Sequence, residues 1–448
     1  MIKPDKLLDQ LTKTLRDAKA DTASVCAQAS RRSVYRFAHG RVHQTVDQER
    51  LSVAITVVDG KRAGTASTES LDPDALKRCL NAAQAIAAHV PKQDFAPTFP
   101  AGLSIRRTED FDRETANHPP EACADTLSRL FRRTSRLKVE LAGSWLTGRD
   151  ELAVVNTHGT ANFHAATVAT VKLVTLRGNL SGFARGSSRR VSQLAADELL
   201  SSALKQALHR AAPVDVPIGV HEVILGPEAV AELLEWLAFI AFGAKAFQER
   251  TSFLAGRMGE SLFDPQLSIH DDALDPHTLR VPFDYEGTPK RRTALIDKGK
   301  AAGIVYDSVY GARFGQPSTG HAMPPGDSDG PLPLHLTIAP GDAPTASLIA
   351  SCKRGLFIPR FHYVNGLLNP REALMTGLTR EGAFLIEKGK LTKPVRTLRF
   401  TQSLLEAFRH IKGISSERKL VADPSSGSGC CLAPSLHLDA FTFTGCSA

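Results

Sequence analysis

Apolar residues recur at helical spacing in five segments of the chain. The segments contain Leu7–Leu15, Leu76–Ile86, Leu127–Phe131, Leu199–Leu208 and Val230–Ala244. Residues three and four positions apart lie on one face of a helix, so each segment is predicted to form an amphipathic helix. Pro73 and Pro227 stand at the expected first turns of two of these helices, a position that proline favours.

Shorter apolar and β-branched runs predict strands between these helices. Val53–Val58 is followed by an Asp-Gly pair, which is typical of a tight hairpin turn. Leu152–Asn156 and Ala166–Leu176 are separated by a turn that contains Gly159. Glu222–Leu225 leads directly into the last predicted helix.

Beyond Gly256 the pattern changes to short strands and turns rich in Gly and Pro. Leu295–Lys300 and Leu385–Lys390 are near copies, and each is predicted to be a strand that enters a tight turn. Two copies indicate two similar hairpins, because a solenoid would need a sustained repeat. Many short strands of this kind favour a barrel or a sandwich.

The pattern therefore predicts an α+β protein. One or two N-terminal α/β domains come first, and a β-rich, barrel- or sandwich-like C-terminal domain with one long helix follows. Residues 90–100 include three prolines and are predicted to be a linker. Two more prolines near residue 215 mark a second boundary, so the predicted divisions are 1–95, 96–217 and 218–448.

Composition excludes several classes of protein. Among 448 residues, 42% are hydrophobic and 23% are charged, which excludes a mostly disordered, collagenous or coiled-coil chain. The net charge of +8 is spread over basic doublets without a run of five, and aromatic residues do not interleave with them. We therefore expect no nucleic-acid partner and a solvated basic surface.

Cysteine usage and hydropathy bear on the compartment. The seven cysteines include no C-x-x-C pair, so a reducing compartment fits better than a disulfide framework. No apolar leader follows Met1, and the longest apolar stretch, Trp236–Ala244, is far shorter than the ~20 residues that cross a bilayer. We expect a cytoplasmic protein that does not insert into a membrane.

Common catalytic motifs are absent from the sequence. It contains no G-x-x-x-x-G-K-[ST] loop, no G-x-G-x-x-G after a strand and no G-x-S-x-G elbow. His270–Glu286 is rich in carboxylates and imidazoles that could bind a divalent cation, but only His270 and Asp272 would share a strand face. Cys430 and Cys431 would point to opposite faces of a strand, which favours structural thiols over a metal site.

Gly315–His321 is a turn-rich loop with hydroxyl groups and exposed backbone donors. Loops of this kind often line clefts. It is the first candidate for a binding site in this chain.

Stretches along almost the whole chain resemble the TldD/PmbA family of metallopeptidase-like proteins, and the PmbA (TldE) branch more than TldD. These stretches are 37–40, 57–68, 155–159, 223–229, 252–260, 267–272, 282–287, 318–321, 376–382 and 434–436. Each is weak alone, and their order and spacing carry the resemblance.

The resemblance implies where zinc would be found, and the sequence departs from it there. The active branch carries H-E-x-x-x-H on the long helix and a further cysteine ligand near the C-terminus, which together hold a zinc ion that activates water. This chain has no histidine between Val223 and Ile269, and the corresponding positions fall at Ala241, Phe242 and Ala246. We therefore expect no catalytic residue, no metal ligand and no cofactor in this chain.

The resemblance further implies a partner role. The chain would be a pseudoenzyme subunit that pairs with a TldD-type H-E-x-x-x-H subunit, which would hold the zinc, and the pair would cleave an extended, unfolded peptide bound by strand addition. Ser318, Thr319, Gly320, His321 and Arg292 would line the substrate chamber. Two alternatives remain open. One is an independent peptidase that uses a relocated metal or none, suggested by the 270–286 cluster and by the Cys and His residues near the C-terminus. The other is a peptide-binding homodimer without enzymatic activity.

Overall fold

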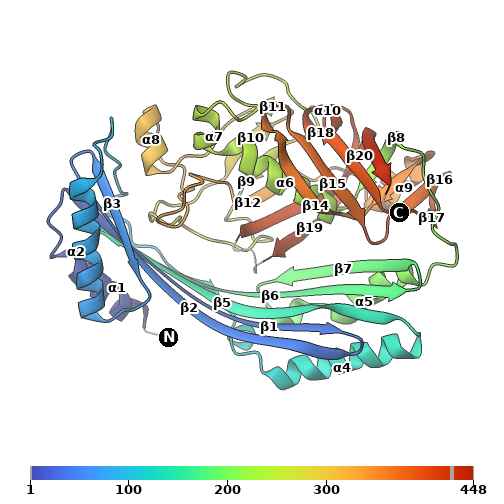
Figure 1. Cartoon of the computed structure of the whole chain (residues 1–448), viewed down its shortest axis with the longest axis horizontal. Helices are drawn as coiled ribbons and strands as arrows, with labels where there is room; N and C mark the ends of the chain where they lie inside the picture. Colours follow the sequence, from blue (N-terminus) through green and yellow to red (C-terminus); the bar gives the residue numbers. More distant parts are fainter. Residues whose placement is uncertain (1–2, 424–427, 447–448) are drawn as a thin grey trace.

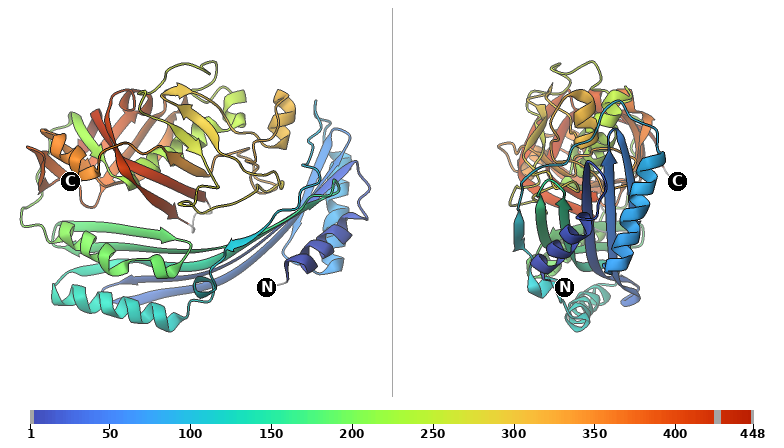
Figure 2. Two further views of the ribbon diagram at one scale, coloured as in Figure 1. Left: turned by 180° about the vertical axis from the view of Figure 1, so that it is seen from behind. Right: turned by 90° about the vertical axis from the view of Figure 1, so that its left-hand side faces the viewer.

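Two β-sheets, one from each half of the chain, form the computed structural model of residues 3–423 and 428–446 (Figure 1). The first two residues of the N-terminal segment considered above lie outside the described residues. The first sheet is long and curved, and the domain that contains the second sheet lies within its concave side (Figure 2).

The first sheet has the strand order β3-β2-β1-β5-β6-β4, and β7 also pairs with β6. Its strands are β1 (Thr22–Ala38), β2 (Arg41–Asp59), β3 (Arg62–Thr68), β4 (Arg106–Asp110), β5 (Glu140–Asn156), β6 (Ala161–Arg177) and β7 (Leu180–Ser188). The predicted hairpin is confirmed, because β2 ends at Asp59 and pairs with β3 through Arg62. Strands on both sides of the 90–100 segment belong to this sheet, since β1 pairs with β5 over fourteen residues, from Ser24 to Phe37.

Helices cover the convex face of this sheet (Figure 1). They are α1 (Pro4–Leu15), α2 (Pro73–His89), α3 (Arg113–Ala116), α4 (Pro120–Arg136), η1 (Val191–Gln193) and α5 (Ala196–Ala207). The leucines of α1 and α2 are buried against β1, β2 and β5 in one core, and those of α4 and α5 are buried against β5 and β6 in another. The amphipathic helices predicted in this half of the chain are therefore confirmed.

The second sheet runs β11-β10-β9-β12-β20-β8-β13-β16-β17, and β14, β15, β18 and β19 join it through β20. Its strands are β8 (Gly219–Leu225), β9 (Ile269–Asp271), β10 (Thr293–Asp297), β11 (Lys300–Ala301), β12 (His335–Ile338), β13 (Arg354–Ile358), β14 (Arg360–Asn369), β15 (Leu374–Arg380), β16 (Phe384–Glu387), β17 (Lys390–Pro394), β18 (Leu398–Ser403), β19 (Ile411–Asp423) and β20 (Ser428–Cys446). The two near-copies form the β10–β11 and β16–β17 hairpins. Each turn is a Lys-Gly pair with positive φ at both residues, which explains the repeated glycine.

One long helical segment is packed into the core of the second domain. It starts as α6 (Pro227–Leu237), continues through one π-helical turn, η2 (Ala238–Phe242), and ends two residues before the predicted end. Gly243 stops it in an extended conformation, and a Cβ there would stand 2.4 Å from the carbonyl oxygen of Pro331. The remaining helices of this domain are α7 (Ala244–Gln248), α8 (Ser308–Phe314), α9 (Thr345–Ser351), η3 (Pro370–Glu372) and α10 (Leu404–Ala407).

This architecture confirms the predicted fold class: an N-terminal α/β region followed by a β-rich domain with one long helix. Within the described ranges, no helix combines the length and the apolar character that crossing a membrane would require.

Candidate functional site

The predicted loop residues Ser318 and Thr319 are tied to the backbone of Tyr306. The Thr319 hydroxyl accepts a hydrogen bond from the Tyr306 amide at 2.8 Å, and the Ser318 hydroxyl donates to the Tyr306 carbonyl at 3.3 Å. Gly320 follows with φ +79°, and a Cβ there would lie 2.7 Å from the Pro289 carbonyl oxygen. The loop is thus held against the chain at residues 289 and 290, and glycine is required at its bend.

His321 belongs to a buried polar group and has no access to solvent. Its Nδ1 lies 2.9 Å from the Thr319 hydroxyl, and its Nε2 lies 3.0 Å from Oδ1 of Asp271 on β9. The other oxygen of Asp271 accepts a hydrogen bond from the His335 amide at 2.7 Å. Both the His321 and the Asp271 side chains are fully buried, so this pair cannot act as a general base on an external substrate.

Lys290 supplies the positive charge of this group. Burial alone would raise the pKa of Asp271, but Lys290 and His321 more than offset it and hold that pKa well below its usual range. Burial, and secondly Lys290, lower the pKa of His321, and they lower that of His335 to about 4. Both imidazoles are therefore neutral around pH 7, and the charges that remain are Lys290 and Asp271.

Arg292, the fifth predicted site residue, does not join this group. Its side chain is 62% exposed, and its nearest polar partners are His270 Nε2 at 3.2 Å and Asp272 at 3.8 Å. Asp271 lies between these two residues in sequence and faces the buried group. The structure therefore brings Ser318, Thr319 and His321 together and places Arg292 outside this group, with an exposed side chain next to His270 and Asp272.

The remaining carboxylates of the 270–286 cluster are satisfied by the protein. Asp284 accepts hydrogen bonds from the amides of Glu286, Thr288 and Ala322, although burial raises its pKa to about 6. Glu286 binds the hydroxyl and the amide of Ser308, and burial followed by the nearby Asp284 carboxylate raises its pKa well above the usual value. Among the described residues, this cluster does not bring three possible metal-ligand atoms together.

A cavity of about 630 Å³ lies beside the buried group, between the concave face of the first sheet and the second domain. Polar residues from both sides line it, including Arg32, Asp150 and His164 from the first sheet and Arg280, Lys290 and His335 from the second domain. His164 Nε2 and His335 Nδ1 are buried, and neither has a hydrogen-bond partner in the described part of the chain. No sequence motif predicts this wall, because its residues come from segments that are distant in the sequence.

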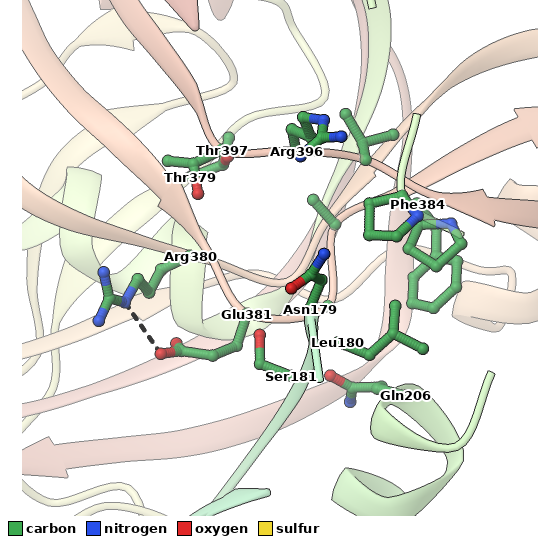
Figure 3. Close-up of a pocket in the computed structure, with 15 residues that line it drawn as sticks. Asn179, Leu180, Ser181, Gln206, Thr379, Arg380, Glu381, Phe384, Arg396 and Thr397 are labelled. Atoms are coloured by element: carbon green, nitrogen blue, oxygen red, sulfur yellow. Dashed lines mark hydrogen bonds and ion pairs between the residues drawn. The ribbon is translucent and has the colours of Figure 1, made fainter. Parts of the chain in front are cut away.

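Figure 3 shows a smaller cavity of about 210 Å³, where the β6–β7 turn meets the second domain. Asn179 and Gln206 line one side, and Arg380 and Glu381 line the other. The Glu381 carboxylate is already paired with Arg380 at 2.9 Å and with Arg360 at 3.3 Å. The carboxylate of this cavity is thus already occupied by two arginines, at a junction between the two sheets.

The positions where the resemblance places zinc ligands cannot bind a metal. Ala241 and Phe242 are fully buried in the core of the second domain, where the Phe242 ring packs edge-on against Phe253. Ala246 follows on α7 and offers no ligand atom. The residues present at this place do not fit zinc, so no chemical step can be assigned to zinc there.

Comparison with known proteins gives consistent matches over both halves of the chain. The family described as the PmbA/TldA metallopeptidase C-terminal domain matches residues 218–445, and the PmbA/TldA metallopeptidase domain 1 matches residues 23–87. The Metalloprotease TldD homolog of Haemophilus influenzae is 23% identical over 392 residues, which cover 82% of this chain and 80% of that protein. The Metalloprotease PmbA of Escherichia coli O157:H7 is 23% identical over 448 residues, which cover 94% of both chains.

The fold also matches a solved structure. The crystal structure of TldE from Thermococcus kodakarensis superposes with a TM-score of 0.86 over 98% of this chain and 99% of that chain, at 20% sequence identity.

Proposed function

The chain belongs to the TldD/PmbA family of metallopeptidases, and from this premise we propose that it is a non-catalytic, PmbA/TldE-like subunit of a two-chain metalloprotease. The complete enzyme would cleave unfolded peptides or small proteins. Its zinc would be held by a TldD-type partner that carries H-E-x-x-x-H.

One observation carries this proposal. The chain contains no H-E-x-x-x-H sequence, and the expected ligand positions hold Ala241, Phe242 and Ala246. Water activation by zinc needs imidazole, carboxylate or thiolate ligands around an open coordination position. Two of these three residues, Ala241 and Phe242, are buried in an apolar core. A small shift of the backbone would therefore not bring ligand atoms to these positions.

The open edge of β14 supports association with a second chain. Within the described residues, β14 pairs only with β15, and its exposed side chains include Tyr363 at 77%, Leu367 at 55% and Leu368 at 46%. Long apolar edge strands are rarely left uncovered in soluble proteins. We propose that this edge contacts the TldD-type subunit, or a second copy of this chain in a homodimer.

The extended peptide would bind near the loop at 318–321 and Arg292, with backbone hydrogen bonds supplying most of the affinity. Of these residues, Arg292 is exposed, Ser318 and Thr319 are half-buried, and Gly320 and His321 are buried. The proposal therefore gives direct peptide contact to Arg292, Ser318 and Thr319. Gly320 and His321 would hold the loop in place.

A reducing, cytoplasmic environment is part of the proposal. All seven cysteines are free, and six of them are buried. Buried free thiols are compatible with a compartment that keeps cysteines reduced.

The deciding experiment uses tag-free protein in a peptide-hydrolysis assay, alone and mixed with a TldD-type homologue that carries H-E-x-x-x-H. We expect no chelator-sensitive hydrolysis by the chain alone, and hydrolysis by the mixture that exceeds the rate of the homologue alone. Chelator-sensitive hydrolysis by the isolated chain would overturn the proposal and favour an independent peptidase. A stable homodimer that binds peptide, with no effect on the homologue, would favour the non-enzymatic alternative.

A further inference from the structure

Three side chains with different metal-binding atoms converge on the face of the second sheet that is covered by α9. Glu222 belongs to β8, His437 to β20, and Cys352 caps the C-terminus of α9. Their ligand atoms all lie within 4.8 Å of one another, and this is the one such group of three found in the described ranges. We propose that Glu222, Cys352 and His437 bind a single Zn²⁺ ion.

The sheet register explains how two of the ligands meet. In the antiparallel pairing of β8 with β20, His437 stands opposite Ile224. Glu222 precedes Ile224 by two residues and so shares its face of the sheet. Nε2 of His437 lies 2.7 Å from Oε1 of Glu222, which shows that the two side chains point at each other.

Packing of α9 brings the third ligand to the same place. Cys352 lies in a small apolar core with Ile224 and Leu348 of α9. Gly355 makes room for the thiol, because a Cβ at that position would stand 2.7 Å from Sγ of Cys352. The same Cβ would stand 2.6 Å from the backbone oxygen of Glu222, so Gly355 is also required by the close approach of β8.

Burial leaves an entry path for a cation. Cys352 is fully buried and His437 is 4% exposed, whereas the Glu222 side chain retains 22% of its surface. A cation would therefore approach along Glu222. The carboxylate would bind through Oε1, because Oε2 is already 3.1 Å from the Lys412 ammonium.

The surrounding charges balance a divalent ion. Lys412 also pairs with Asp439, at 2.8 Å. With Zn²⁺ bound, the charge of the ion would be cancelled by the Cys352 thiolate and Glu222, and the exposed Lys412–Asp439 pair would add no net charge. A buried site of zero net charge avoids the large cost of an uncompensated ion in a medium of low dielectric constant.

Ligand chemistry favours zinc over magnesium or calcium. A thiolate and an imidazole are the ligands of zinc, whereas the hard cations prefer oxygen. At zinc–ligand lengths of about 2.0–2.3 Å, tetrahedral ligand atoms stand roughly 3.3–3.6 Å apart. Glu222 Oε1 and His437 Nε2 would have to separate from 2.7 Å to reach this spacing, and water would take the fourth position.

Binding would release one proton. Burial, followed by the charge of Glu222, raises the pKa of the Cys352 thiol to about 11, so without metal the thiol is protonated. On binding, the S–H bond breaks, the Zn–S bond forms and the proton passes to solvent, while the imidazole binds through Nε2 with its proton on Nδ1.

The test titrates the tag-free full chain with Zn²⁺ in competition with a chromophoric chelator. We expect one zinc per chain at sub-micromolar affinity, and at least a tenfold loss of affinity in Cys352→Ser. Cys123→Ser removes a buried thiol from the core of the first sheet and should leave the affinity unchanged. Failure to bind, or equal binding by Cys352→Ser and the parent, would overturn the proposal.

A spectroscopic test does not depend on how Cys352→Ser folds. Co²⁺ replaces Zn²⁺ in tetrahedral sites, and a bound thiolate produces an intense near-ultraviolet charge-transfer band. The measurement uses a Cys446→Ser background, because Cys446 is the exposed cysteine of the chain. The band should appear with one equivalent of Co²⁺ and disappear in His437→Gln. Saturation with Co²⁺ without this band would refute the site, whatever the peptidase assays show.

Discussion

His321 Nε2 lies 3.0 Å from Asp271 Oδ1 inside the second domain, and neither side chain reaches solvent. In many hydrolases such a pair activates a nucleophile, but here no substrate can reach it. Lys290 adds a third member, whose charge keeps the Asp271 carboxylate ionised. The group thus anchors the 318–321 loop beside the large cavity, which is a positioning role.

His335 makes the stability of the protein depend on pH. Burial, then Lys290, lowers its pKa from 6.5 to about 4. Between these values the unfolded chain binds a proton that the folded chain does not, so the free energy of unfolding falls as the pH falls from about 6.5 to 4, by on the order of 3 kcal/mol. Urea unfolding at a series of pH values should show a steeper fall in the parent than in His335→Gln. A residual dependence should remain in the variant, because His321 keeps a lowered pKa and the raised pKa of Asp284 acts in the opposite direction.

The matched control for that experiment is His89→Gln. His89 is exposed at the end of α2, so its removal should leave the slope unchanged. If the free energy of unfolding depended on pH equally in His335→Gln and in the parent protein, His335 would not be a source of this dependence.

Asp110 should be among the most sensitive positions for stability. Its fully buried carboxylate pairs with Arg107 at 3.3 Å, with Arg280 of the second domain at 2.9 Å, and with Arg189. Asp110→Asn leaves these guanidinium groups without their counter-charge, and we expect a loss of about 3–5 kcal/mol in the free energy of unfolding.

Asp150→Asn provides the comparison, because it also removes a carboxylate from an arginine. Asp150 is 47% exposed and lies 2.7 Å from Arg32, so its loss should cost at most about 1 kcal/mol. Chemical denaturation of both variants measures the difference. Similar losses in the free energy of unfolding for both variants would mean that burial does not determine how much these ion pairs contribute to stability.

Local signals in the sequence predicted much of the fold. Gly60 at the β2–β3 turn and both residues of each Lys-Gly pair have positive φ, and these turn signals are visible without tertiary contacts. The first half of β2 was not predictable in this way, because residues 41–50 are exposed on both faces and show no alternation. They are a strand because residues Ser30 to Ala38 of β1 pair with them, and that pairing is not encoded locally.

The candidate sites also differ in whether local sequence signals or only the tertiary fold brings their residues together. Ser318, Thr319 and His321 are close in sequence, and the loop that joins them could be recognised from its turn residues. Glu222 and His437 are 215 positions apart and meet only through the register of β8 with β20. No spacing rule could have found that pair, because its geometry is a property of the folded sheet.

Arg292 offers a direct test of the proposed peptide site. Its side chain is 62% exposed and held by two weak contacts, so Arg292→Ala should not change stability. If the peptide lies along this side of β9, the variant should weaken peptide binding about 3- to 10-fold, as expected for one exposed charge. Fluorescence anisotropy of a labelled peptide with the assembled complex measures this change.

Arg291→Ala is the control, since its side chain is the exposed neighbour in sequence. Equal weakening in both variants would indicate a general effect of surface charge. No weakening in either would remove Arg292 from the peptide site.

The proposed contact through β14 can be tested on a single leucine. Leu367 is 55% exposed on the edge strand β14. Val364 on the same strand is only 8% exposed and points into the core. An aspartate at position 367 would be buried without a partner in the interface, and losing even 2 kcal/mol there weakens association about 30-fold. Leu367→Asp should therefore sediment as a monomer under conditions where the parent forms a dimer, with itself or with the TldD-type subunit.

Leu391→Asp is the control, at a leucine that is 39% exposed on β17, and this variant should stay associated. If Leu367→Asp remained a dimer and Leu391→Asp dissociated, the interface would lie at the β16–β17 end of the sheet.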